Sequence, residues 1–160
     1  MNAPESVNLL DRFVLKNLQI TQLEARLQQT AKEAGKQEGK VELNLTPRTV
    51  QADAGDNLPA YQVGAQLVCD GGGAQGPGPR FTARVAFETI YQQVGGDPVD
   101  LAQFTAHHAS LTRQLYPLLA QELRTLLLRL GLEKVHLPHD LAARAKPVEG
   151  ESIQLSGALH

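Results

Sequence analysis

The sequence has little of what several functional classes require. Its 160 residues include one cysteine, no tryptophan, four phenylalanines and three tyrosines, and the formal net charge is −2. A single cysteine excludes an internal disulfide and a multi-cysteine zinc cluster. Without an excess of positive charge the chain cannot neutralise many phosphates, and few aromatic side chains are available to stack on bases. We therefore expect no nucleic-acid partner.

Signals for a membrane or for secretion are also missing. No run of 18 apolar residues occurs, and residues 1–6 lack the basic and apolar stretches of a secretory signal. Hydrophobic residues make up 42% of the chain and charged residues 20%, which is typical of a globular domain. We expect one domain over residues 1–144, a flexible tail over residues 145–160, no membrane insertion and a cytoplasmic location.

Alternating apolar and polar residues predict three strands, at residues 41–45, 61–70 and 81–88. A loop rich in glycine and proline joins the last two, so they are expected to form an antiparallel hairpin. Residues 9–30 are ambiguous. Their apolar spacing locally favours a helix, but they also contain short alternations whose phase slips twice, as in a strand with bulges.

The C-terminal half has helical spacing. Asp97 and Pro98 suit a helix start, an apolar stripe follows from Leu101 to Leu115, and Pro117 either kinks this helix or begins another. Gly131 suits the C-terminal cap. Seven of the thirteen residues from 118 to 130 are leucine, which is more apolar surface than one sheet face requires. This surplus predicts a partner for the helix, such as another subunit.

Residues that could carry chemistry have simpler structural interpretations. The glycines of residues 71–78 lack the lysine of a phosphate loop and do not lead into a helix. His136 and His139 flank Pro138, so they cannot share a helical face as metal ligands do. Cys69 lies on the apolar face of a predicted strand, where it behaves as a small hydrophobic side chain. We therefore predict no catalytic residue, no metal and no cofactor.

The order of the segments resembles SecB, the bacterial export chaperone, from about Phe13 to Leu141. Residues 40–45 (Lys-Val-Glu-Leu-Asn-Leu) are similar to the family's second strand, and residues 61–70 and 81–95 to its third and fourth. Leu115-Tyr116-Pro117 is similar to the Leu-Phe-Pro that opens the family's long helix. Residues 135–141 (Val-His-Leu-Pro-His-Asp-Leu) are similar to the stretch before its final helix.

The resemblance implies an α+β fold of the SecB type. A four-stranded antiparallel sheet, with a long bent first strand over residues 13–28 and a meander of three more, would precede a long helix and a short C-terminal helix. It also implies a homotetramer, built as a dimer of dimers. Leu119, Leu123, Leu126 and Leu130 are the candidates for the core and for helix–helix assembly.

The function implied is that of an ATP-independent holdase that binds unfolded polypeptides, and the resemblance implies service in protein export. Candidates for the client groove are the apolar residues on or near the sheet: Leu18, Ile20, Tyr61, Phe87, Ile90, Tyr91 and Leu132. Their alternative interpretation is plain core packing.

The sequence departs from the family where the SecA motor docks. The family carries acidic residues there, whereas the aligned positions hold Gln22, Arg26 and Arg84. Loss of charge at one position and reversal at two argue against docking of SecA. Protection of the antitoxin of a toxin–antitoxin pair fits these departures. An adaptor that binds one folded partner and a protein with a small-ligand or enzymatic cavity are the remaining alternatives.

Overall fold

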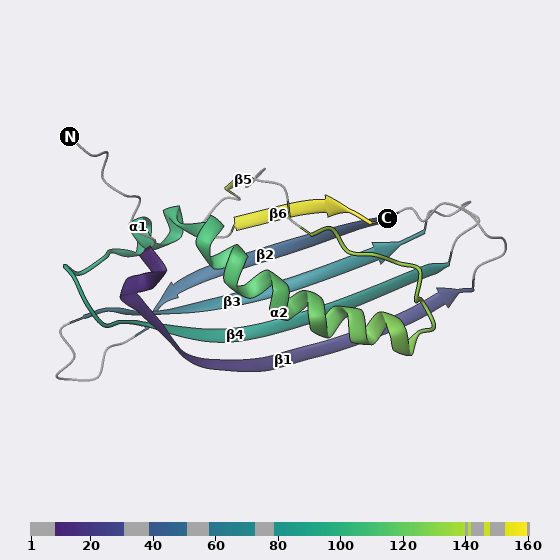
Figure 1. Ribbon diagram of the computed structural model, residues 1–160, viewed down its shortest axis with the longest axis horizontal. Helices are drawn as coiled ribbons and strands as arrows, with labels where there is room; N and C mark the ends of the chain where they lie inside the picture. Colours follow the sequence, from purple (N-terminus) through teal and green to yellow (C-terminus); the bar gives the residue numbers. More distant parts are fainter. Residues whose placement is uncertain are drawn as a thin grey trace.

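The chain folds into one antiparallel sheet crossed by one long helix (Figure 1). The computed structural model describes residues 9–30, 39–50, 58–72, 79–139, 141, 146–147 and 153–159. Its elements, in chain order, are η1 (Leu9–Arg12), β1 (Phe13–Gln29), β2 (Gly39–Thr49), β3 (Ala60–Gly71), β4 (Arg80–Gln93), α1 (Leu101–Ala106), α2 (His108–Arg129), β5 (Lys146–Pro147) and β6 (Ile153–Ala158).

The sheet has the strand order β1-β4-β3-β2-β6-β5, and its described strand pairs are antiparallel. The predicted strands form the β1-β4-β3-β2 part, in which β2, β3 and β4 are the meander. Two strands were not predicted. Residues 145–160 were expected to be a flexible tail, but β6 pairs with β2 and the two-residue β5 pairs with β6. The number of strands is therefore larger than the predicted four.

Strand β1 confirms the bent-strand prediction over the local helix pattern. Its ladder with β4 has register shifts between Leu15 and Asn17, between Ile20 and Gln22, and near the end of the strand. The first two shifts fall where the apolar alternation changes phase. The extra residue at each shift lets the apolar side chains return to the same face of the sheet.

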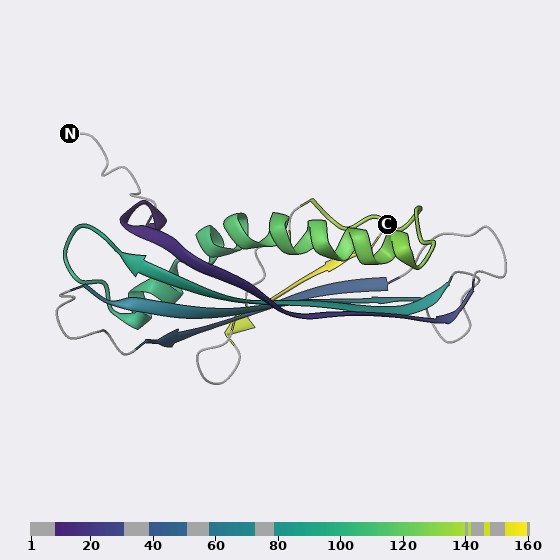
Figure 2. The same cartoon turned by 90° about the horizontal axis from the view of Figure 1, so that it is seen from below.

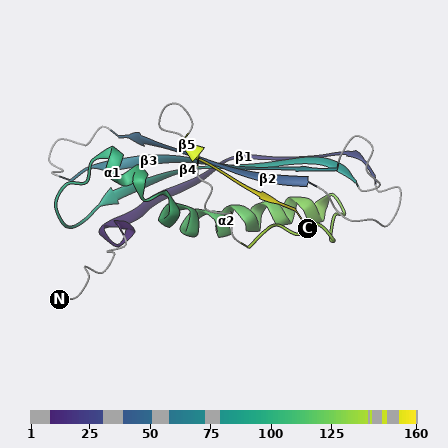
Figure 3. The same cartoon turned by 90° about the horizontal axis from the view of Figure 1, so that it is seen from above.

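One face of the sheet is buried and the other is polar. Along β2, β3 and β4 every second residue is buried, and these residues form the core with Leu111, Leu115, Leu119, Leu123 and Leu127 of α2. Two views along the sheet place η1, α2 and the segment after α2 on the same side of it (Figures 2 and 3). The opposite face carries half-buried and exposed residues such as Gln62, Gln66 and Arg84.

The ends of the helices are fixed by local hydrogen bonds. Helix α1 begins one turn later than Asp97 predicts, because Asp100 is the N-cap and forms a capping box with Gln103. The buried side chain of Gln93 holds the preceding turn. Its amide donates to the carbonyl oxygens of Gly95 and Asp97 (2.9 and 2.6 Å) and accepts from the backbone N–H of Val99 (2.9 Å).

The end of α2 confirms the cap predicted at Gly131. This glycine has φ +79°, and the backbone N–H of Leu132 donates to the carbonyl oxygen of Leu127 (2.9 Å), as in a Schellman motif. The expected short C-terminal helix is wrong for the residues described after α2, which contain none. Glu133 and Lys134 form a turn instead, and residues 135–138 follow as neither helix nor strand, because Leu132, Val135 and Leu137 are buried and Pro138 disfavours a helix.

Candidate functional site

The sheet is wider than the helix that covers it. The five longer strands of the sheet, β1, β4, β3, β2 and β6, span roughly 19 Å at a spacing of about 4.8 Å, whereas an α-helix with its side chains is about 10–12 Å across. Helix α2 crosses the sheet obliquely, and residues 132–139 turn back toward β2 and β6 (Figure 1). Apolar surface therefore remains on both flanks of α2.

The first flank is an apolar row on β1, which we call the β1 strip: Leu18, Ile20, Leu23 and Leu27. These residues pair with Thr89, Phe87, Val85 and Phe81 of β4, all buried under the helix, so the row lies on the helix-facing side. Ile20 is 42% exposed and Leu23 is 50% exposed. Leu18 and Leu27 are half-buried against the core. The strip is thus an apolar surface that the protomer leaves partly open.

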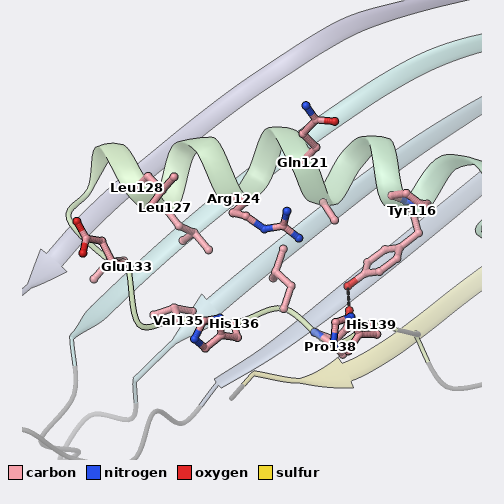
Figure 4. A pocket seen from close by; sticks show the side chains of 14 residues that line it. Tyr116, Gln121, Arg124, Leu127, Leu128, Glu133, Val135, His136, Pro138 and His139 are labelled. Atoms are coloured by element: carbon pink, nitrogen blue, oxygen red, sulfur yellow. Dashed lines mark hydrogen bonds between the residues drawn. The ribbon is translucent and has the colours of Figure 1, made fainter.

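The second flank is a groove between α2 and residues 132–139, which we call the α2 groove (Figure 4). Its volume is about 710 Å³. Its lining combines side chains of α2 with those of residues 132–139: Tyr116, Pro117, Ala120, Gln121, Arg124, Leu127, Leu128, Leu132, Glu133, Val135, His136, Leu137, Pro138 and His139.

Local structure explains how the α2 groove is held open. The cap at Gly131 reverses the chain, and the hydroxyl of Tyr116 on α2 donates to the carbonyl oxygen of Pro138 (Figure 4). Leu127, Leu132 and Val135 are buried, whereas Arg124 and His136 are exposed. The groove therefore combines an apolar floor with a rim of polar and charged side chains.

The structure separates the residues predicted for a client groove. Leu18 and Ile20 lie in the β1 strip and Leu132 lies in the α2 groove. Ile90 is half-buried and alternates with the helix-facing residues of β4, so it belongs to the opposite face. The client role of these residues stays a prediction.

Tyr61, Phe87 and Tyr91, the other predicted groove residues, are at most 3% exposed in the core. Tyr61 and Tyr91 pack around the ring of Phe104, with ring centroids 4.7 and 5.9 Å from it. Their hydroxyls have partners: Tyr61 donates to the carbonyl oxygen of Val99, and Tyr91 donates to the side chain of Gln114 (2.8 Å). Burial raises the pKa of both hydroxyls, and the nearby Asp100 carboxylate raises the pKa of Tyr61 further. The protomer leaves them inaccessible to a client.

The three positions aligned with the SecA-docking face lie together on the polar face of the sheet. Gln22 pairs with Ala86, Arg26 with Thr82, and Arg84 with Glu24. Arg26 and Arg84 are exposed. Gln22 donates to a carboxylate oxygen of Glu24 (3.2 Å). The pairing of β1 with β4 thus brings Arg26 and Arg84 to one surface, with the acidic Glu24 beside them.

The leucines predicted for helix–helix assembly face into the protomer. Leu119 and Leu123 are fully buried against the sheet, and Leu126 and Leu130 are half-buried beside the core. The exposed leucines of α2 are Leu118 (40%) and Leu128 (53%), which the sequence pattern did not distinguish. Assembly through α2 stays a prediction, and its accessible apolar contacts would come from these two residues.

Groups that could react are few among the described residues. The Cys69 thiol is buried, and desolvation together with the Asp70 carboxylate raises its pKa to about 12. Within that part of the chain, no three His, Cys, Asp or Glu residues gather as metal ligands would. None of the described helices is long and apolar enough to cross a bilayer. Asp140 and the glycine-rich residues 73–78 lie outside the described residues.

Sequence reasoning missed most of the α2 groove. The signal was present in residues 135–137, where two apolar residues flank His136 shortly after the Gly131 cap and the turn at Glu133 and Lys134. That pattern indicates an extended segment with one buried side. Leu23 was also missed, although it continues the apolar alternation of β1.

Comparison with known proteins gives a structural likeness. No family model matches the chain, and no curated protein matches it. Among solved structures, it is similar to the Rv1957 SecB-like chaperone of Mycobacterium tuberculosis, in complex with a ChAD peptide from the Rv1956 HigA1 antitoxin. The identity is 21% and the TM-score 0.60, over 81% of this chain and 92% of the other. The chain therefore has the fold of a SecB-like chaperone, as the order of its segments predicted.

Proposed function

We propose that the chain is an ATP-independent chaperone that holds extended, nonnative polypeptide segments. The observation that carries this proposal is the apolar surface left open on both flanks of α2. Ile20 and Leu23 are about half exposed on one flank, and the α2 groove of about 710 Å³ lies on the other. Exposed apolar surface of this kind marks sites of interaction. The fold shared with a SecB-like chaperone supports the same conclusion.

The two flanks suit weak contacts with several segments of one client. An extended peptide can bury apolar side chains in the α2 groove against Leu128, which is 53% exposed, while its polar groups meet the rim of Arg124 and Glu133. Each contact is small, but segments of one chain bind together with a high effective concentration. A client that folds buries the same segments, so it leaves without ATP.

The polar face of the sheet favours a dedicated client over service to SecA. Arg26 and Arg84 would oppose a motor surface that accepts acidic residues. The similar M. tuberculosis chaperone is solved with an antitoxin peptide. We therefore propose protection of an antitoxin as the more specific role, with protein export through SecA as the alternative. Co-purification from the native host would give one small client in the first case and SecA in the second.

The decisive experiment is refolding of a slow-folding, denatured test protein without ATP. We expect the purified chain to delay refolding and not to bind the folded form of the same protein. Light scattering coupled to size exclusion gives the oligomer, for which we propose a homotetramer. An intact oligomer that causes no delay would refute the holdase and would favour an adaptor for one folded partner.

A further inference from the structure

The C-terminal strand β6 occupies a strand edge that can accept a polypeptide. It pairs with β2 over six residues without a register shift, from Lys40↔Ala158 to Leu45↔Ile153. The β2–β3 ladder is equally regular. A regular edge presents backbone N–H and C=O groups at the spacing that an added strand requires.

The side chains of β6 show what this edge accepts. Ile153, Leu155 and Leu159 are buried in the core, while Ser156 and Ala158 between them are exposed. Gly157 completes the inward-facing row. A Cβ atom at Gly157 would lie 3.0 Å from the Pro138 side chain and 3.1 Å from that of Leu141. The edge therefore selects apolar residues at three alternate positions and glycine at the one between the second and the third.

Strand β6 is weakly tied to the rest of the sheet. Its described ladder partners are β2 along its whole length and β5 at one end only. On its other side, only Ile153 and Gln154 pair with a described strand, the two-residue β5. A strand that is paired along one side only opens locally at a lower free energy than a strand paired on both sides.

We propose that client segments bind by strand addition to β2 in place of β6, which is the chain's own competitor for that site. This inference rests on the proposed chaperone function and adds a sequence rule for clients: apolar-x-apolar-x-Gly-x-apolar. Because β6 is tethered, its effective concentration is high, and a free segment binds only to the extent that it outcompetes β6. A client that also contacts the α2 groove gains a second contact and overcomes this competition. The two sites are adjacent, because Leu137 and Pro138 line the α2 groove and Pro138 also lies beside Gly157 of β6.

A reversible cross-link tests the proposal in the full-length chain. Glu42 and Ser156 are direct partners in the β2–β6 ladder, outside the buried row. Opposite residues of antiparallel strands have Cα atoms about 4.5–5.5 Å apart, which a disulfide can bridge. The variant Glu42→Cys/Ser156→Cys therefore locks β6 when oxidised and releases it when reduced. Cys69 does not interfere, because it is buried and poorly ionised.

The probe is a fluorescein-labelled peptide with the sequence of residues 151–160. We expect the reduced variant to bind it at least tenfold more tightly than the oxidised variant, by anisotropy. A peptide with Gly157→Val should lose binding to the reduced form at least tenfold. As a second perturbation, Ile153→Ser/Leu155→Ser in the full chain loosens β6 and should tighten binding of the unmodified peptide about tenfold.

The outcomes separate this inference from the proposed function. If oxidation abolishes peptide binding and also shortens the refolding delay, strand addition at β2 is supported. If both forms bind the peptide equally, or neither binds it, strand addition is overturned, even if the refolding delay persists. If oxidation abolishes peptide binding but leaves the delay unchanged, clients bind elsewhere and the proposal is overturned. If the wild-type chain causes no refolding delay, the chaperone function itself is refuted.

Discussion

The β1 strip offers a quantitative test of the surface through which clients would bind. The change is Ile20→Ser together with Leu23→Ser, which removes the two most exposed apolar side chains of the strip. Both residues lie on the helix-facing side of an edge strand, so the change leaves the polar face of the sheet intact.

The size of the effect follows from the exposed fractions. Full burial of an Ile or Leu side chain stabilises by about 1.5–3 kcal/mol. These residues are 42% and 50% exposed, so a client that covers them buries roughly half of each. The pair then contributes about 1.5–3 kcal/mol to client binding, and each 1.4 kcal/mol is a factor of ten. We expect the double variant to bind an unfolded client about 10- to 100-fold more weakly.

The assay is the delay of refolding as a function of chaperone concentration, which gives an apparent Kd for the unfolded client. Gln19→Ser is the matched control, because Gln19 is exposed on the same strand and pairs with Glu88 on the polar side. Urea denaturation of each variant confirms that it is folded. Size exclusion with light scattering gives its oligomeric state.

Two results would contradict this reasoning. An apparent Kd within twofold of the wild type would show that clients do not contact the β1 strip. Dissociation of the oligomer at unchanged client affinity per protomer would assign Ile20 and Leu23 to a subunit interface instead.

Two further predictions concern buried groups. The pKa of Cys69 is about 12 when folded and ordinary when unfolded, so the unfolded thiol ionises first and stability should fall as pH rises from about 9 toward 12. Urea midpoints at pH 8 and 10 should show a smaller decrease for Cys69→Ala than for the wild type, and equal decreases would refute the assignment. The substitution Gln93→Ala removes the side-chain hydrogen-bond partner of the Val99 N–H and of the carbonyl oxygens of Gly95 and Asp97. It should therefore lower the free energy of unfolding by about 2–4 kcal/mol. A loss below about 1 kcal/mol, or one equal to that of Gln19→Ala, would refute this role.

The strands that could be read from the sequence are those with one buried face and one polar face. Val41, Leu43 and Leu45 alternate with polar residues because β2 has the core on one side and solvent on the other. Strand β6 has the same alternation at Ile153 and Leu155, but serine and glycine follow it, and its stability comes from pairing with β2. Such non-local pairing leaves little trace in a short segment.

The candidate site was harder to predict because exposure depends on strand order. Ile20 and Phe87 are equally apolar in sequence, and they are direct partners in the β1–β4 ladder. Phe87 is buried because β4 lies inside the sheet, whereas Ile20 is exposed because β1 is the outer strand. Sequence alone gives the face of the sheet to which a residue belongs. It does not give the distance of that residue from the edge.

The register shifts of β1 have a consequence for solubility. A long outer strand is a template for uncontrolled aggregation, because its unpaired N–H and C=O groups can recruit strands from any chain. Strand β1 has 17 residues, but three register shifts interrupt it and charged residues such as Lys16 and Arg26 project from it. The longest stretch without a shift, from Gln22 to Leu27, spans six residues and carries the charged Glu24 and Arg26. The register shifts and the charges of this outer strand thus oppose edge-to-edge pairing between copies of a protein that also exposes apolar surface.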